Sequence, residues 1–174
     1  MGSYNLEEIT TRKNFSAVFY LDANPDVAQA IEHGNLKSAW HHFKWFGRKE
    51  GRTQRLSSDI IKDSKQTKLE RIRPLLRDDL PFEETGDLYD FLSDELRTTH
   101  NIVDVLDVSS HHYDADAGQL IAKYPDGMLL DCGAGRRPIY FDNVVNFEIV
   151  PFDTTDVLGV GEELPFRDNS FQAV

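Results

Sequence analysis

The chain has 174 residues, of which 19 are basic and 30 are acidic, so its net charge at pH 7 is -11. This length suffices for about one domain with a hydrophobic core. The acidic balance argues against a nucleic acid partner, because binding to phosphate backbones needs a basic surface. No apolar run approaches the roughly 18 residues of a membrane span, and a single cysteine excludes an internal disulfide. We therefore expect a cytoplasmic protein without a membrane span.

The charge is divided unevenly along the chain. Residues 1–77 hold 14 basic and 9 acidic side chains, a net charge of +5, whereas residues 78–174 hold 5 basic and 21 acidic side chains, a net charge of -16. Such a contrast is typical of regions with different roles. The sequence predicts three segments: a helical hairpin module over residues 15–55, a charged helical linker over 56–100, and an α/β segment over 101–174.

The hairpin module is predicted from capping and stop signals. Asn24 precedes Pro25 as an expected N-cap, and Gly34 is expected to end the first helix. Ser38 is expected to cap a second helix that Gly47 ends. We expect the aromatic side chains of this helix to be core residues: Trp40, Phe43 and Phe46.

The middle of the chain gives weaker signals. Residues 53–80 show patchy helical periodicity, which Pro74 should end. Residues 78–100 are strongly acidic, and we interpret them as a solvated helix and linker. Four apolar side chains of this stretch are expected to pack against the rest of the protein: Leu88, Phe91, Leu92 and Leu96.

The last segment alternates between helix and strand signals. A helix is predicted over residues 117–124, and short apolar runs predict strands over 128–131, 144–150, 156–160 and 170–174. The first of these strands leads into a glycine turn at Gly133 and Gly135, and Glu148 lies near the end of the second. This pattern predicts an α/β fold with a nucleoside site, because a carboxylate beyond the second strand can accept both ribose hydroxyls.

The same turn is poorly suited to a dinucleotide. Glu148 follows Gly135 by 13 residues, fewer than the roughly 20 of dinucleotide folds. Pro138 occupies the position of the third glycine, and proline supplies no N–H group for a pyrophosphate. A nucleoside without phosphates therefore fits better.

These residues resemble a known family. The run from Leu129 to Gly135, then Glu148, then the run Glu162 to Phe171 containing Leu-Pro-Phe, is similar to the Rossmann-like S-adenosylmethionine-dependent methyltransferases of the type-11 kind. The resemblance covers roughly residues 115–174 and implies methyl transfer to an unidentified acceptor. It implies S-adenosylmethionine as the cofactor and six residues as its site: Asp131, Gly133, Gly135, Glu148, Gly161 and Glu162.

Two positions depart from the family's pattern. Val160 stands where an aspartate near the adenine is common, and Gln172 stands where the family has aspartate. The family's sheet has seven strands, of which this chain supplies the first four at most. Because Val174 lies inside the fourth predicted strand, we expect the chain to be a fragment of a longer enzyme. The alternatives are a binding module without transferase activity and, less favoured because of Pro138, a nucleotide-sugar or NAD enzyme.

The hairpin module has a resemblance of its own. The run Tyr20 to Val27, then His42, Phe46-Gly47 and Glu50-Gly51-Arg52, resembles a short helical module of bacterial surface-glycan enzymes and large secreted proteins. That resemblance implies a glycan or a small metabolite as the methyl acceptor.

The remaining polar residues have simpler interpretations. Asp131 is expected to orient the glycine turn, and Cys132 to be a small buried residue. Arg136 and Arg137 either bind an anionic substrate or cap the loop. The adjacent histidines at 41–42 and 111–112 lack the further ligands of a tetrahedral set, so no metal site is predicted.

Overall fold

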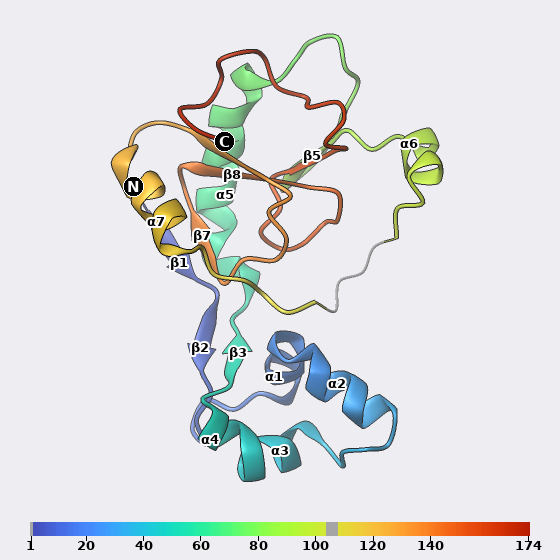
Figure 1. Cartoon of the computed structure of the whole chain (residues 1–174), viewed down its shortest axis with the longest axis vertical. Coiled ribbons are helices and arrows are strands. Elements are labelled where there is room, and N and C mark those ends of the chain that lie inside the picture. Colours follow the sequence, from blue (N-terminus) through green and yellow to red (C-terminus); the bar gives the residue numbers. More distant parts are fainter. Residues whose placement is uncertain (1, 104–107) are drawn as a thin grey trace.

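The computed structural model of the protein describes residues 2–103 and 108–174, so residues 104–107 of the predicted α/β segment lie outside the described residues. Figure 1 shows a helical module at one end of the molecule and a sheet with its covering helices at the other. A ribbon of two antiparallel strands, β2 (Glu7–Ile9) and β3 (Thr53–Arg55), leads into and out of the module. No helix among the described residues has the length and apolar character needed to cross a bilayer.

The module contains four α-helices and a π-helical turn. The predicted first helix is confirmed as α2, and the predicted second helix is a continuous run of three elements; an unpredicted helix, α1, precedes both. The elements are α1 (Ala17–Ala23), α2 (Pro25–Glu32), α3 (Ala39–His42), the π-helical turn η1 (Phe43–Gly47) and α4 (Arg48–Glu50). The cap at Ser38 is confirmed, because its side chain accepts a hydrogen bond from the His41 N–H at 3.2 Å.

Asn24 does not cap α2 through its side chain as predicted. Its amide instead donates to the Tyr20 carbonyl at 2.7 Å and the Thr53 carbonyl at 2.8 Å, so it ties α1 to the outgoing strand β3. The core of the module is formed by Tyr20, Val27, Ala39 and Phe43. Trp40 and Phe46 were expected in this core, but they are 42% and 47% exposed. Trp40 lies at the edge of this core, because its ring contacts those of Phe15 and Phe43, with ring centres 5.0 and 5.5 Å apart. The π-helical turn changes the spacing at Phe46.

The main sheet has five strands in the order β4-β5-β9-β8-β6. Four of these strands, β5, β9, β8 and β6, run parallel to one another. The remaining strand, β4, is antiparallel to β5. The fold is therefore α/β, as predicted. The strands are β4 (Glu83–Thr85), β5 (Leu88–Asp90), β6 (Leu129–Cys132), β8 (Val144–Glu148) and β9 (Val157–Leu158).

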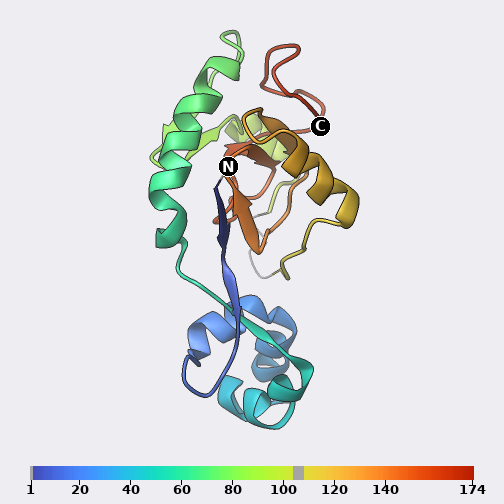
Figure 2. The same ribbon diagram turned by 90° about the vertical axis from the view of Figure 1, so that its left-hand side faces the viewer.

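Helices cover both faces of this sheet, α5 (Lys62–Ile72) on one and α7 (Ala115–Lys123) on the other (Figure 2). The α5 side chains Leu69 and Ile72 pack with Leu130 and Val145, whereas Ile121 of α7 packs with the alternate residues of β6 and β8. This alternation follows from the two-residue period of a strand. The helix predicted over 117–124 is confirmed as α7, whose N-cap Asp114 accepts from the Ala117 N–H at 2.8 Å.

The predicted linker over 56–100 differs most from the structure. It contains a helix with one buried face, α5, and two strands of the main sheet, β4 and β5. The predicted stop at Pro74 is confirmed, since α5 ends at Ile72 and a 3-10 turn follows. The remaining elements of this segment are the 3-10 turns η2 (Ser58–Ile61) and η3 (Arg73–Leu75) and the helix α6 (Asp94–Thr99).

The connections between the parallel strands also have an unexpected form. Parallel strands are usually joined by a helix, but residues 133–143 contain only the short strand β7 (Ile139–Phe141), and residues 149–156 form a loop. Strand β7 pairs with β1 (Ser3–Asn5) at the N-terminus, so the first residues of the chain complete the α/β segment. The fourth predicted strand is represented by a single parallel bridge between Ala173 and Leu129.

Candidate functional site

The glycine turn lies where β6 ends. Gly133 and Gly135 have φ angles of +75° and +62°, in the left-handed region that glycine adopts without strain. The N–H groups of Gly133 and Ala134 both donate to the Phe147 carbonyl, at 3.0 and 3.1 Å. The turn is therefore fixed across the carboxyl end of the neighbouring strand, β8.

Glu148 is the last residue of β8, and its carboxylate contacts the glycine turn directly. One oxygen, Oε2, accepts from the Gly135 N–H at 2.6 Å, and the other, Oε1, accepts from the Ile149 N–H at 2.7 Å. These bonds hold the side chain in one orientation. Because a carboxylate oxygen has two acceptor sites, each oxygen can accept one further hydrogen bond. The structure thus brings together three of the predicted residues, Gly133, Gly135 and Glu148.

Asp131 has partners that sequence reasoning did not identify. The Tyr113 hydroxyl donates to its Oδ2 at 2.6 Å, and the Arg137 guanidinium donates to the same oxygen at 2.8 and 3.0 Å. The guanidinium also lies over the Tyr113 ring, 4.1 Å from its centre. Burial, and then the Asp131 charge, raise the pKa of Tyr113 above its usual range, so the phenol remains a hydrogen-bond donor. This cluster fixes the end of β6 that precedes the turn.

Gly161 and Glu162 form an exposed turn after β9, and no hydrogen bond between them and the glycine turn is found in the described part of the chain. The residue before them, Val160, is buried with Leu88, Leu92 and Leu158. The third strand is nevertheless adjacent to Glu148, because the Gly159 N–H donates to the Glu148 carbonyl at 3.1 Å. Of the predicted site, this last turn is the part without a hydrogen bond to the other predicted residues within the described ranges.

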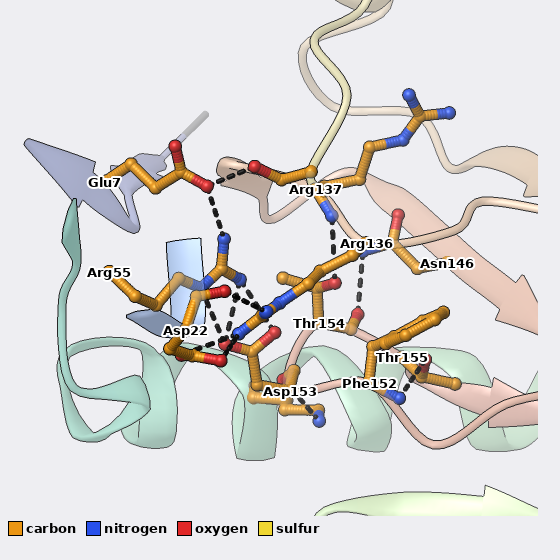
Figure 3. A network of polar contacts seen from close by, with 12 residues as sticks. Glu7, Asp22, Arg55, Arg136, Arg137, Asn146, Phe152, Asp153, Thr154 and Thr155 are labelled. Atoms are coloured by element: carbon orange, nitrogen blue, oxygen red, sulfur yellow. Dashed lines mark hydrogen bonds and ion pairs between the residues drawn. The ribbon is translucent and has the colours of Figure 1, made fainter. Parts of the chain in front are cut away.

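Arg136, the residue after the glycine turn, joins the turn to the helical module. Its guanidinium donates to both carboxylate oxygens of Asp22 in α1 at 2.8 Å, and to the Asp22 carbonyl at 2.9 Å (Figure 3). Its side chain is only 8% exposed. Of the two interpretations left open for Arg136 and Arg137, the structure favours the loop-capping one, since both side chains are already in ion pairs.

A second arginine, Arg55 at the end of β3, strengthens the same junction. It is 1% exposed and donates to both oxygens of Asp153, with a further contact of 3.3 Å to Glu7. Figure 3 shows these side chains converging between the ribbon of the module and the loop that leads to β9. This junction was not predicted from the sequence. Arg55 and Asp153 are 98 residues apart along the chain, and an ion pair between such distant residues produces no local sequence pattern.

A third buried group lies under α5, at the amino-terminal end of the parallel strands. Lys68 and Asp156 are fully buried and form an ion pair of 2.7 Å. The Tyr140 hydroxyl donates to the other Asp156 oxygen at 2.6 Å, and the Lys68 ammonium lies 3.6 Å from the centre of the Tyr140 ring. Ligands of open α/β sheets bind at the opposite end of the strands, so this group stabilises the fold.

The expectation for Cys132 is wrong. The thiol is exposed, because β6 ends there and the side chain points away from the core. His42 is buried within the module, where its Nδ1 and the Tyr20 hydroxyl are 2.9 Å apart. In the ranges 2–103 and 108–174, no group of three or more histidine, cysteine, aspartate or glutamate side chains is arranged to hold a metal ion.

Comparisons of the chain with protein-family models, with curated proteins and with solved structures found no match.

Proposed function

We propose that the chain contains the cofactor-binding part of an S-adenosylmethionine-dependent methyltransferase. The observation that carries this proposal is the contact between the Glu148 carboxylate and the Gly135 N–H at the carboxyl ends of two neighbouring parallel strands. Ligands of open α/β sheets bind at this end of the strands. The acceptor of the methyl group is proposed to be a glycan or a small metabolite, from the resemblance of the hairpin module.

The order of the strands supports this proposal. Strands β9, β8 and β6 are neighbours in that order, and Ala173 bridges to the free side of β6. Nucleoside-binding sheets have the same arrangement of the third, second, first and fourth strands, and their ligands lie where the order reverses. In this chain that point is beside Gly133, immediately after β6.

The residues at this point fit a nucleoside. A Cβ atom placed on Gly133, Gly135 or Gly161 would meet nothing within 4 Å, so there is open space over these glycines. Glu148 keeps one acceptor site on each oxygen for a pair of ribose hydroxyls. Both features are those expected of a turn that a ligand approaches closely.

S-adenosylmethionine, when bound, supplies a methyl group on a positively charged sulfur. The chain's own residues would act by orientation: Glu148 through the ribose, and the backbone of Gly133 and Gly135 by close approach. Alignment of this kind can lower a barrier by about 7–11 kcal/mol in favourable cases. Asp131, whose charge is balanced by Arg137, holds the turn in place.

The structure opposes a dinucleotide at the same place. The glycine turn leads into β7, so no helix begins there, and a helix N-terminus is the usual site for a pyrophosphate. Pro138, just before β7, adds no N–H group.

Isothermal titration of the purified chain with S-adenosylmethionine, S-adenosylhomocysteine and NAD tests the proposal. We expect binding of the two sulfur nucleosides and none of NAD. Glu148→Ala should weaken the affinity by about 1–3 kcal/mol, a factor of about 5 to 150, because it removes two hydrogen bonds. Glu70→Ala, which removes the same charge from the exposed side of α5, should leave it unchanged. Binding of NAD alone, or an unchanged affinity in Glu148→Ala, would contradict the proposal.

A binding module without transferase activity is the second candidate. Val160 favours it, because this side chain is buried in an apolar cluster and offers no acceptor to an adenine. A folded chain that binds none of the three ligands would support this candidate.

A further inference from the structure

The run of helix from Ala39 to Glu50 has an outer surface of unusual composition. The inner side is buried and formed by Ala39, His42, Phe43 and Gly47. Seven side chains of this run are exposed, among them Phe46 and Glu50. We name the other five the tryptophan–lysine face: Trp40, Lys44, Trp45, Arg48 and Lys49. The π-helical turn from Phe43 to Gly47 interrupts the spacing of an α-helix, so the face is defined by the exposure of these side chains and not by a row of residues four apart.

The cations of this face have no carboxylate partner among the described residues, and the adjacent Glu50 is paired with Arg52 instead. Residues 37–49 contain four basic side chains and no acidic one. In the described part of the chain, no ion pair is found for Lys44, Arg48 or Lys49, although the Lys44 ammonium lies 4.9 Å from the centre of the Trp45 ring. The nearby Arg52, in contrast, is paired with Asp26 and Glu50 inside the module.

Both tryptophans of the chain belong to this face, and they are 42% and 54% exposed. Exposed tryptophans among uncompensated cations differ from an ordinary solvated helix face, which mixes acidic and basic residues. Tryptophan is enriched where a protein meets lipid headgroups, and lysine and arginine are attracted to anionic lipids.

We propose that the tryptophan–lysine face docks the protein onto an anionic phospholipid surface. Figure 1 shows α3 and α4 at the end of the molecule farthest from the main sheet. The strongly acidic region from residue 78 onward would therefore be held away from the lipid. Its repulsion would be weakened further because charges are screened over about 8 Å at physiological salt.

The shape of the face favours a lipid surface over a sugar polymer. Its side chains stand on the outer side of a helix and line none of the hollows around the glycine turn or the module junction. A polymer chain would be held best in a groove, whereas a lipid surface accepts a convex face. A second copy of the chain, whose acidic region could meet these cations, is the other occupant that an experiment must distinguish.

Sedimentation with vesicles tests the proposal directly. Vesicles of phosphatidylcholine containing phosphatidylglycerol should bind the protein, and vesicles of phosphatidylcholine alone should not. Because both tryptophans lie on the face, their fluorescence should shift to shorter wavelength on binding. Binding should weaken as salt rises from low to high concentration.

Charge reversal gives the decisive comparison. The triple variant Lys44→Glu, Arg48→Glu, Lys49→Glu should lose more than tenfold in vesicle affinity, since each cation near such a surface contributes a factor of about five. The control is a second triple variant with the same change in net charge at exposed positions elsewhere: Lys13→Glu, Lys62→Glu, Lys123→Glu. It should bind the vesicles more tightly than the triple variant of the face. Trp45→Ala should weaken binding without unfolding the module, because that ring is more than half exposed.

Three results would overturn the proposal. The first is equal binding to neutral and anionic vesicles. The second is an equal loss in both triple variants. The third is the absence of vesicle binding, and self-association that the face variant abolishes in ultracentrifugation would then identify a second copy of the chain as the occupant.

Discussion

The ion pair beneath α5 predicts a large cost for a single substitution. In Lys68→Met, the Asp156 carboxylate would stay fully buried with two donors left, the Tyr140 hydroxyl and the Asn146 N–H. Two carbonyls would lose their donor as well, those of Phe141 and Val144. Removing one partner of a buried pair costs about 3–5 kcal/mol. A domain of this size has a total free energy of unfolding of about 5–15 kcal/mol. The substitution should therefore remove a large share of the stability of the folded chain.

Urea denaturation followed by circular dichroism measures this loss. Lys62→Met is the matched control, because Lys62 begins the same helix but is exposed, and it should change the unfolding free energy by no more than about 0.5 kcal/mol. The double variant Lys68→Met, Asp156→Asn should cost less than the sum of the two single changes. A loss below about 1 kcal/mol in Lys68→Met would refute the reasoning, since the buried carboxylate would then be tolerated alone.

The same pair predicts a dependence on pH. Burial lowers the pKa of Lys68 to about 8, against the opposing effect of Asp156. The unfolded chain, with an ordinary lysine near 10.5, binds more protons than the folded chain between these values, so the Lys68 contribution to stability rises with pH from about 8 to 10. The unfolding free energy of the wild type should rise over this window relative to that of Lys68→Met. A constant difference would show that Lys68 keeps an ordinary pKa.

Two further substitutions concern the turn and its attachment. Gly135→Ala should destabilise the chain by about 1–2 kcal/mol, because a residue with a Cβ is strained at a φ of +62°. Its control, Gly118→Ala in the middle of α7, should stabilise the chain by about 0.5–1 kcal/mol. Equal shifts of the melting temperature in the two variants would contradict this prediction. Asp22→Ala should lower the unfolding free energy by about 1–3 kcal/mol, because Arg136 then loses its carboxylate partner. The exposed Asp126→Ala is its control, and a comparable effect there would remove the special role of Asp22.

The parts of the fold with strong local patterns could be predicted from the sequence. The strands Leu129–Cys132 and Val144–Glu148 each begin with two apolar residues that are buried on opposite faces of the sheet, which is typical of parallel sheets. The turn between them was predictable because Gly133 and Gly135 are needed for positive φ. Glu148 was predicted near the end of a strand over 144–150, and it is the last residue of β8, which ends two residues earlier than predicted.

The parts built from long-range contacts could not be predicted. Strands β1, β4 and β5 have three residues each, too few for a periodic pattern, and β4 and β5 lie in a strongly acidic stretch. Their place in the sheet depends on partners far along the chain, such as Val157 for Tyr89. The buried charges of Lys68 and Arg55 were equally hidden, because a lysine or arginine in a polar segment is ordinarily exposed.

The motif of the hairpin module is explained by its own architecture. Asn24 bonds to α1 and β3, Arg52 binds Asp26 and Glu50, and Gly47 is required because a Cβ there would collide with the Tyr20 hydroxyl. Since these groups are satisfied within the module, the motif residues named here specify its fold. Two other sets of residues take no part in these contacts: Asp22, which holds the glycine turn through Arg136, and the tryptophan–lysine face on the outside.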